Sequence, residues 1–230
     1  MSVKLGVPSK GRMMEATFSW FAGRGVRLGR AGSARDYAGT LDGVRGVELV
    51  LLAAGEIPRE LAAGRIQLGV TGSDLVRERL APWHAQVKVL AGLGFGKAEL
   101  VLCVPAAWVD VNLLEDLDAV AAMFRTRNGF RLRIATKYHR LVHEFLRKNG
   151  VADYQLVDSQ GATEGAVKNL TAEAIADITS SGETLRANHL KVLEDGLIHA
   201  SQATLYTSKA NRLTGEDQVN YRGFLDVLGL

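Results

Sequence analysis

The sequence has a single cysteine, Cys103, and only 4 prolines among its 230 residues. One cysteine excludes a disulfide framework and a cysteine-based zinc cage within one chain. Cys103 lies in the apolar run 99–105, where we expect a buried structural thiol rather than a nucleophile. Internal repeats, low-complexity segments and proline-rich linkers are also absent, which predicts domains joined by short crossovers.

Long apolar runs are missing as well. Nowhere do 18 apolar residues follow one another, and the N-terminal segment MSVKLGVPSKG lacks the apolar stretch of a signal peptide. We therefore expect a soluble, cytoplasmic protein with no membrane partner.

The net charge is small, but it is unevenly distributed. The whole chain carries a formal charge of +3, whereas residues 1–97 hold 14 Lys and Arg against 8 Asp and Glu, a surplus of six. This surplus suits an anionic ligand. Because the basic residues are scattered singly and no aromatic-rich RNA-binding motif accompanies them, we expect a phosphorylated small molecule and no nucleic acid.

What the sequence does contain is alternating strand and helix patterns. In the first half, strands are predicted at 3–8, 47–53 and 67–72, and helices at 13–25 (capped by Ser9), 57–64 and 73–81. In the second half, strands are predicted at 131–137 and 153–159, a helix at 138–150, and a helix running into a strand at 171–178. The glycines of LGFGK, 93–97, fit a crossover between the halves. The alternation favours two α/β lobes.

The stretch ADITSSGETLRANHL, 176–190, combines a strand end, a turn rich in hydroxyl groups and a helix start. Backbone N–H groups of Ser181, Gly182, Glu183 and Thr184 would form an anion site there. An ordinary helix cap by Ser181 or Thr184 is the alternative. Asp177 favours binding of a sugar phosphate over a simple helix cap, because a carboxylate beside such a loop can accept a hydrogen bond from a ribose hydroxyl.

The turns that follow the predicted strands share one expected location. In parallel α/β sheets the ligand lies beyond the carboxyl ends of the strands. The segments VPSKGR, GVTGSD, ATKYH and ADITSSGETL all occupy such ends, so we expect them to line one cleft. His139 and His143 lie one helical turn apart, but with no third ligand in the pattern we interpret them as a surface pair.

Seven fragments, in the same order, resemble the family of short-form ATP phosphoribosyltransferases. They are PSKGR (8–12), Ile-Pro (57–58), LGVTGSD (68–74), LGFGKAELVLCVP (93–105), RIATKY (133–138), Gly-x-x-Glu (161–164) and ADITSSGETLRANHL (176–190). Any one of them is weak evidence, and the last is the most specific. Together they are spread through most of the chain.

The resemblance implies a fold like that of type II periplasmic binding proteins, with two α/β lobes and the ligand cleft between them. The implied first lobe is 1–97 with 187–230, and the second is 98–186. The implied reaction joins N1 of the adenine of ATP to C1′ of phosphoribosyl pyrophosphate (PRPP), with Mg²⁺ held through the substrate phosphates rather than by a protein metal site. A non-catalytic two-lobed solute- or anion-binding protein is the alternative.

The family's functional residues are carried over by matching motifs. PRPP binding is expected from Glu164, Asp177, Ser180, Ser181, Gly182, Glu183, Thr184 and Leu185. ATP or pyrophosphate binding is expected from Gly11, Thr71 and Gly72, and catalytic roles from Lys10, Arg12 and Arg35. Cations at 10 and 12 in a first helical turn oppose the helix dipole, so a bound anion explains them better than solvation alone.

Two positions depart from the family pattern. Ala53 stands where many relatives have an arginine, for which Arg59, or Lys10 and Arg12 together with magnesium, could substitute. Leu170 stands where a glycine is usual. The chain ends at Leu230, without the regulatory domain of the long forms. Resemblance to the short form therefore implies a homo-oligomer that also assembles with a regulatory subunit similar to histidyl-tRNA synthetase.

Overall fold

The computed structural model describes residues 3–30, 39–159 and 161–230. It divides the chain into two compact units, which we call the first unit (up to Lys97, with Gln202–Leu230) and the second unit (Ala98–Ser201). The chain leaves the first unit directly after the glycine-rich segment, where Gly94 and Gly96 both have positive φ. This segment is therefore a crossover, as the sequence predicted.

The second boundary lies later in the chain than position 187, which the sequence favoured. Strand β11 (Leu190–Ser201) pairs antiparallel with β7 (Ala98–Pro105), with Leu190 opposite Pro105 and Ser201 opposite Ala98. Residues 187–201 consequently belong to the second unit. The pairing partners are far apart in the sequence, so the local pattern gave no sign of it.

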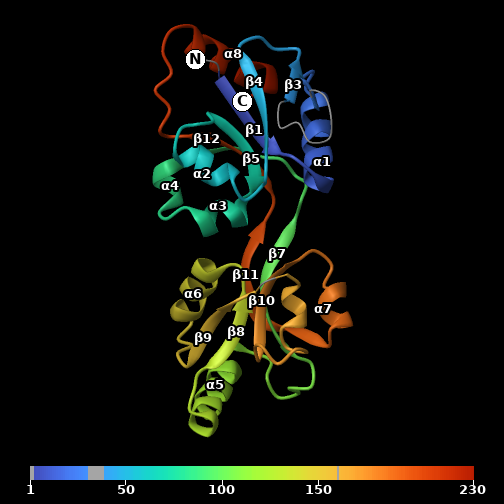
Figure 1. The fold of residues 1–230 in the computed structure, drawn as a ribbon, viewed down its shortest axis with the longest axis vertical. Coiled ribbons are helices and arrows are strands. Elements are labelled where there is room, and N and C mark those ends of the chain that lie inside the picture. Colours follow the sequence, from blue (N-terminus) through green and yellow to red (C-terminus); the bar gives the residue numbers. More distant parts are fainter. Residues whose placement is uncertain (1–2, 31–38, 160) are drawn as a thin grey trace. The chain divides into compact units, whose positions relative to one another are not determined.

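The first unit is built on a five-stranded mixed sheet in the order β4-β1-β5-β12-β6 (Figure 1). Strands β1, β4 and β5 are parallel, and β12 runs antiparallel to both β5 and β6. The strands are β1 (Val3–Pro8), β4 (Val47–Leu52), β5 (Leu68–Gly72), β6 (Val87–Gly92) and β12 (Ala203–Ser208). A separate hairpin pairs β2 (Arg27–Arg30) with β3 (Gly39–Asp42).

Helices cover both faces of this sheet. They are α1 (Gly11–Ala22), α2 (Ile57–Ala62), α3 (Ser73–Arg79), α4 (Trp83–Gln86) and α8 (Glu216–Leu228). On one face Phe21 of α1 and Phe224 of α8 stack at 6.1 Å over the apolar side chains of β1. On the other face Ile57 and Val76 of α2 and α3 pack together. A buried sheet with both faces covered explains the nearly continuous apolar runs of these strands.

The second unit repeats this arrangement with a mixed sheet in the order β11-β7-β10-β8-β9. Its remaining elements are α5 (Leu114–Asn128), β8 (Leu132–Thr136), α6 (His139–Lys148), β9 (Tyr154–Asp158), the short helix η1 (Thr163–Gly165), β10 (Ala174–Thr179) and α7 (Glu183–Ala187). Leu117 of α5 and Val142 of α6 bury one face of the sheet. Cys103, Ile175 and Leu185 pack on the opposite face.

Two local predictions were wrong. Ser9 does not cap α1, because the backbone is still extended at Lys10 and the helix begins only at Gly11, which has φ +72°. Residues 171–173 are not helical, and β10 begins at Ala174. There, pairing with β7 and β8 outweighs the helix propensity of the alanines.

No helix in the described part of the chain is both long enough and apolar enough to cross a membrane.

Candidate functional site

The residues singled out from the sequence fall into two groups, one in each unit. The segment Thr179–Leu185, which we call the hydroxyl loop, joins β10 to α7 in the second unit. The segment Lys10–Arg12, which we call the basic segment, joins β1 to α1 in the first unit. Both follow the carboxyl end of a strand, where α/β folds place their ligands.

The hydroxyl loop is shaped by its own side chains. Gly182 has φ +70° and forms the N-cap of α7, a conformation that favours glycine. The Gly182 N–H donates to Thr179 Oγ1 at 2.9 Å, and the Glu183 N–H donates to Ser181 Oγ at 3.4 Å. Two of the N–H groups expected to bind an anion are therefore already bonded inside the loop.

The remaining features of the loop still suit an anion. Ser180, Ser181, Glu183 and Thr184 are exposed, whereas Leu185 is buried and anchors the turn in the core. Thr184 lies in the first turn of α7, where N–H groups have no carbonyl within the helix to bond.

One cation lies directly against the loop. Arg186 Nη2 donates to the Ser181 carbonyl oxygen at 3.1 Å. Its Nη1 lies so close to Gly182 that a Cβ there would stand 3.0 Å away. The sequence interpretation did not single out this arginine, although it is four residues after Gly182 on the short helix.

A carboxylate cluster adjoins the loop at the end of β10. Burial raises the pKa of Asp177, and the neighbouring Glu164 carboxylate raises it further. The Ile178 N–H, which donates to Asp177 Oδ1 at 2.9 Å, the Thr163 hydroxyl and the Lys137 ammonium act in the opposite direction. Asp177 therefore lies among hydrogen-bond donors and near the Lys137 ammonium, and its carboxylate can accept hydrogen bonds from a ligand with several hydroxyl groups.

Lys137 is a second residue that the sequence interpretation left without a role. It follows β8, and its Nζ donates to the Gly161 carbonyl oxygen at 2.6 Å. That bond ties the end of β8 to the segment that carries Glu164. The motif RIATKY pointed to this place, and the fold adds that the lysine's charge acts to lower the pKa of Asp177.

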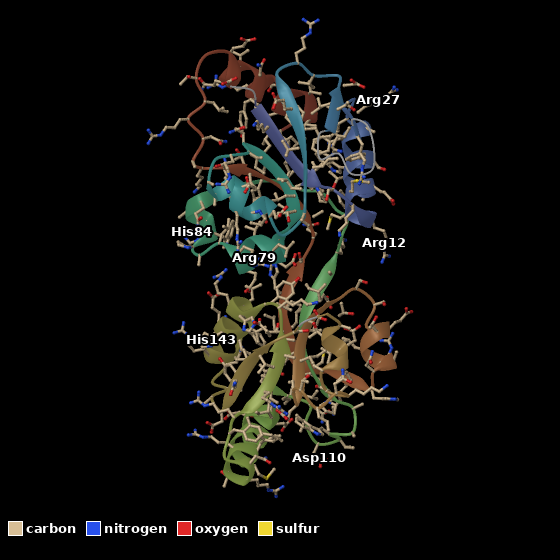
Figure 2. All side chains as sticks on the ribbon, in the orientation of Figure 1. Arg12, Arg27, Arg79, His84, Asp110 and His143 are labelled. Carbon is tan, nitrogen blue, oxygen red and sulfur yellow. The ribbon has the colours of Figure 1, made fainter. Side chains whose placement is uncertain are left out.

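The basic segment is built differently. Lys10, Gly11 and Arg12 are exposed, and α1 has neither a side-chain cap nor an acidic residue in its first turn. Figure 2 labels Arg12 at this helix start. A helix N-terminus with added cations and no carboxylate favours a bound anion.

The hairpin brings a third cation to the same place. Arg30, at the end of β2, donates from Nη2 to the Ser9 carbonyl oxygen and lies 3.3 Å from Met14 Sδ. The sequence gave no reason to join Arg30 to the basic segment. Arg35 lies outside the described residues.

Thr71 and Gly72 are enclosed in the first unit. Thr71 has no exposed area, and its Oγ1 donates to the Ala54 carbonyl oxygen at 2.9 Å, where it braces the turn after β4. Gly72 is buried and pairs with Ala203 in the sheet. Both residues therefore position the chain, and their role in ATP or pyrophosphate binding stays a prediction.

The histidines and the cysteine have separate surroundings. His139 Nε2 lies 2.7 Å from Asp158 Oδ1, and His143 Nδ1 lies 2.8 Å from the Tyr154 hydroxyl. Cys103 is buried, and burial together with the Asp177 carboxylate raises the pKa of its thiol to about 12. Among the described residues no group of three or more His, Cys, Asp or Glu is placed to hold a metal ion.

Comparison with known proteins identifies a family and similar proteins for this chain. The family model for ATP phosphoribosyltransferase (HisG) matches residues 53–222. The chain is 71% identical over 209 residues to an ATP phosphoribosyltransferase from Cereibacter sphaeroides, covering 91% of this chain and 89% of that protein.

Solved structures show the same fold at lower identity. An ATP phosphoribosyl transferase (HisG:HisZ) complex from Thermotoga maritima matches with a TM-score of 0.73 and 20% identity, over 99% of this chain and 96% of that one. A histidine kinase sensor domain described as similar to periplasmic binding proteins matches with a TM-score of 0.52 and 14% identity, over 99% and 89%. The predicted fold class is confirmed.

Proposed function

Because the chain belongs to the ATP phosphoribosyltransferase family, we propose that its hydroxyl loop and its basic segment bind phosphate groups of the two substrates. The enzyme joins N1 of the adenine of ATP to C1′ of PRPP and releases pyrophosphate in histidine biosynthesis. The family match at 71% identity carries the assignment of the reaction. The roles of individual residues are our proposals.

The chemistry needs no activated side chain. The lone pair of adenine N1 is free at neutral pH and forms the new bond to C1′. The bond from C1′ to the pyrophosphate oxygen breaks, and its electron pair leaves with pyrophosphate. The rate must therefore come from positioning and from stabilising negative charge. This agrees with a protein whose one thiol is buried and protonated.

The hydroxyl loop is our candidate for the 5′-phosphate of PRPP. Exposed Ser180, Ser181 and Thr184 offer hydroxyl donors, and the first turn of α7 adds backbone N–H groups. Arg186, held against the Ser181 carbonyl, supplies positive charge that the sequence interpretation had not included.

Asp177 and Glu164 are our candidates for the ribose of PRPP. Both are half-buried, and the two carboxylates are close enough for one to affect the pKa of the other. Ribose hydroxyls would donate hydrogen bonds to these carboxylates and so replace the hydrogen bonds from water that burial removes. Lys137 would hold this pair of carboxylates in place and partly offset their mutual repulsion.

The basic segment is our candidate for the pyrophosphate of PRPP or the phosphates of ATP. Lys10 and Arg12 are exposed beside the uncapped start of α1, and Arg30 reinforces them. These three cations could replace the arginine that many relatives have at the position of Ala53. Arg59, the other proposed substitute, is exposed on α2.

Magnesium fits this protein as a companion of the substrates. The described residues include no cage of metal ligands, but Asp177 and Glu164 supply two neighbouring carboxylates. Mg²⁺ is commonly bound by substrate phosphates with one or two carboxylates and waters. When bound it would neutralise charge on the phosphates, while the side chains named above orient the ribose and the leaving group.

We also propose two kinds of assembly and a cytoplasmic location. The Thermotoga maritima relative was solved as a HisG:HisZ complex, which supports a regulatory subunit similar to histidyl-tRNA synthetase for this chain. Self-association into a homo-oligomer is proposed from the family resemblance. Synthesis from ATP and PRPP, both cytoplasmic metabolites, supports the location.

The direct test is to mix the purified chain with ATP, PRPP and Mg²⁺ and to identify the product by mass spectrometry. We expect N1-(5-phosphoribosyl)-ATP and pyrophosphate in equal amounts. Binding of PRPP without any product, with and without a HisZ-type subunit, would instead favour the non-catalytic alternative.

A further inference from the structure

The first unit contains a polar cavity away from the basic segment. It has a volume of about 410 Å³ and is lined by residues of β6, the end of β12, the loop after it and α8. None of its lining residues has a role in the proposed reaction. The residues that decide its chemistry are Lys88, Ser208, Lys209, Asn211, Tyr221 and Arg222.

The floor of the cavity is a fixed hydrogen-bond network. Thr207 Oγ1 donates to the Gln67 carbonyl oxygen at 3.1 Å and accepts from the Tyr221 hydroxyl at 2.8 Å. Asn211 Nδ2 bonds the same carbonyl at 3.3 Å and Thr207 Oγ1 at 3.4 Å. These bonds fix which way the Asn211 amide points.

The network leaves one acceptor unused. Asn211 Oδ1 is buried, and within the described part of the chain it is the buried side-chain atom without a hydrogen-bond partner. An unpaired acceptor of this kind costs free energy. Because Oδ1 is enclosed by protein atoms, it belongs to the floor and does not face the occupant of the cavity.

Ser208 and Tyr221 add to the floor's capacity. Ser208 is 5% exposed, and its Oγ accepts from the Ala210 N–H at 3.1 Å, which leaves the hydroxyl hydrogen for a further acceptor. Burial raises the pKa of Tyr221, so its hydroxyl stays neutral, and its oxygen can accept after donating to Thr207. The floor thus recognises hydroxyl groups rather than an apolar body.

The rim of the cavity is cationic. Lys88, Lys209 and Arg222 come from three different elements, and no carboxylate lines the cavity with them. Lys209 Nζ donates to the His84 carbonyl oxygen at 2.7 Å, which holds this ammonium group in place. Three cations around one concave surface attract and retain an anion.

We propose that this cavity binds a small phosphate monoester that carries hydroxyl groups. The phosphate lies among Lys88, Lys209 and Arg222, and a hydroxyl donates to the Tyr221 oxygen. The volume lies within the usual range for small-molecule sites and suits a sugar phosphate. The site is distinct in sequence from both the hydroxyl loop and the basic segment.

The first test measures the cationic rim. Binding of glycerol 3-phosphate is followed by NMR titration at low salt for the parent, Arg222→Ala and Arg212→Ala. Arg212 is exposed, neighbours Asn211 and does not line the cavity, so it controls for the loss of one charge. We expect affinity to fall about tenfold or more in Arg222→Ala, as for a lost charged hydrogen bond, and about twofold or less in Arg212→Ala.

Equal losses of affinity in the two variants would show that the probe is held only by the general positive charge of the surface, and this would overturn the proposal. If Arg222→Ala does not fold, Lys88→Ala removes a second rim cation in its place. Amide shifts should change at Thr207–Asn211. Shifts confined to Thr179–Leu185 would mean that the probe occupies only the hydroxyl loop, and the cavity proposal would then fail.

The second test measures hydroxyl recognition by Tyr221. Ethyl phosphate has the charge of glycerol 3-phosphate but lacks its hydroxyl groups. We expect the parent to prefer glycerol 3-phosphate by about tenfold, and Tyr221→Phe to lose this preference while retaining its affinity for ethyl phosphate. Equal affinity of the parent for both probes would overturn the proposal that the cavity recognises a hydroxyl group.

Discussion

The hydroxyl loop and the basic segment are two different solutions to binding a phosphate at the carboxyl end of a strand. The hydroxyl loop precedes a short helix and is shaped by hydrogen bonds that its backbone N–H groups donate to the hydroxyl oxygens of Thr179 and Ser181. The basic segment precedes a longer helix, has no such side-chain bonds to its N–H groups and presents exposed cations. The first relies on donors held in position, and the second relies on charge.

This difference has a consequence for mutation. A negative charge introduced into the hydroxyl loop repels the phosphate from all of the loop's donors at once. In the basic segment several cations bind the phosphate, so a substitution removes only one of them. The hydroxyl loop should therefore show the larger effect from a single substitution. The predictions below start with that effect and proceed to smaller ones.

The largest effect is expected from Ser181→Asp. A carboxylate in the hydroxyl loop would stand where the 5′-phosphate must lie, and we expect PRPP binding to be abolished. Stability should change by no more than about 1 kcal/mol, because position 181 is exposed, lies before the N-cap Gly182, and an aspartate there can still accept from the Glu183 N–H. Isothermal titration with Mg²⁺ and PRPP, with a melting curve beside it, measures both quantities.

Asn169→Asp is the matched control for that substitution. It adds the same charge at an exposed position of the same unit, outside the hydroxyl loop. We expect it to keep PRPP affinity within a few fold of the parent, the scale of a screened surface charge. Retained PRPP binding in Ser181→Asp would mean that the loop only starts a helix.

A smaller effect is expected from Arg12→Ala. Loss of one electrostatic stabiliser should lower turnover by about a hundredfold, the low end for losing one donor to a developing charge. Part of the stabilisation should remain, because Lys10 and Arg30 lie at the same place. Steady-state kinetics with saturating ATP and PRPP gives the turnover number.

Arg27→Ala removes the same charge from β2 of the same unit and serves as the control (Figure 2). Its turnover should stay within about twofold of the parent, because exposed charges at a distance are screened by salt. If Arg12→Ala also keeps normal turnover, Arg12 has no part in the mechanism. Arg30, Arg35 and Arg59 would then be the next arginines to replace.

The two segments also differ in what the sequence revealed about them. Strand β10, the turn and α7 follow from local signals, namely a β-branched strand, hydroxyl residues and a glycine. Local signals likewise predicted most strands and helices of the parallel parts of both sheets. They did not predict α5 or α8, and they placed the second unit's end before β11.

The neighbours of both segments depend on contacts that no local pattern contains. Arg30 reaches Ser9 because a hairpin places it there, and the charge of Lys137 acts on the pKa of Asp177 because β8 and β10 are adjacent strands. Thr71 was expected to bind ATP or pyrophosphate from its motif, and the fold shows that its buried hydroxyl donates to the Ala54 carbonyl oxygen. The sequence therefore located the two segments, and the fold added which side chains are exposed there and which residues neighbour them.

The pH dependence of stability should distinguish the buried part of the second unit. Burial raises the pKa of Asp177 in the folded state, so the folded protein binds this proton more readily than the unfolded chain. Stability from this group is therefore highest below the unfolded pKa of about 4 and falls as pH rises through the raised folded value. Asp177→Asn should remove that fall.

We expect Asp177→Asn to match or exceed the parent in stability at pH 7, by no more than about 1 kcal/mol, with the difference shrinking in acid. Urea unfolding at several pH values measures it. Asp110→Asn removes the same charge from an exposed side chain of the same unit and controls for net charge (Figure 2). A stability gain that grows towards low pH would contradict the assigned cause.

The smallest effect concerns backbone strain at Leu170 in the second unit. The basic segment has a glycine at its left-handed residue, Gly11, with φ +72°, whereas Leu170 has φ +56° and is 80% exposed. A side chain costs about 1–2 kcal/mol in that conformation, and glycine costs about 0.5–1 kcal/mol in unfolded-chain entropy. Leu170→Gly should therefore stabilise the protein by roughly 0.5 kcal/mol. Leu170→Ala removes the exposed leucine but keeps Cβ, so it should gain nothing. Urea unfolding of both variants decides the cause, because equal gains would trace the effect to the exposed apolar side chain rather than to the backbone.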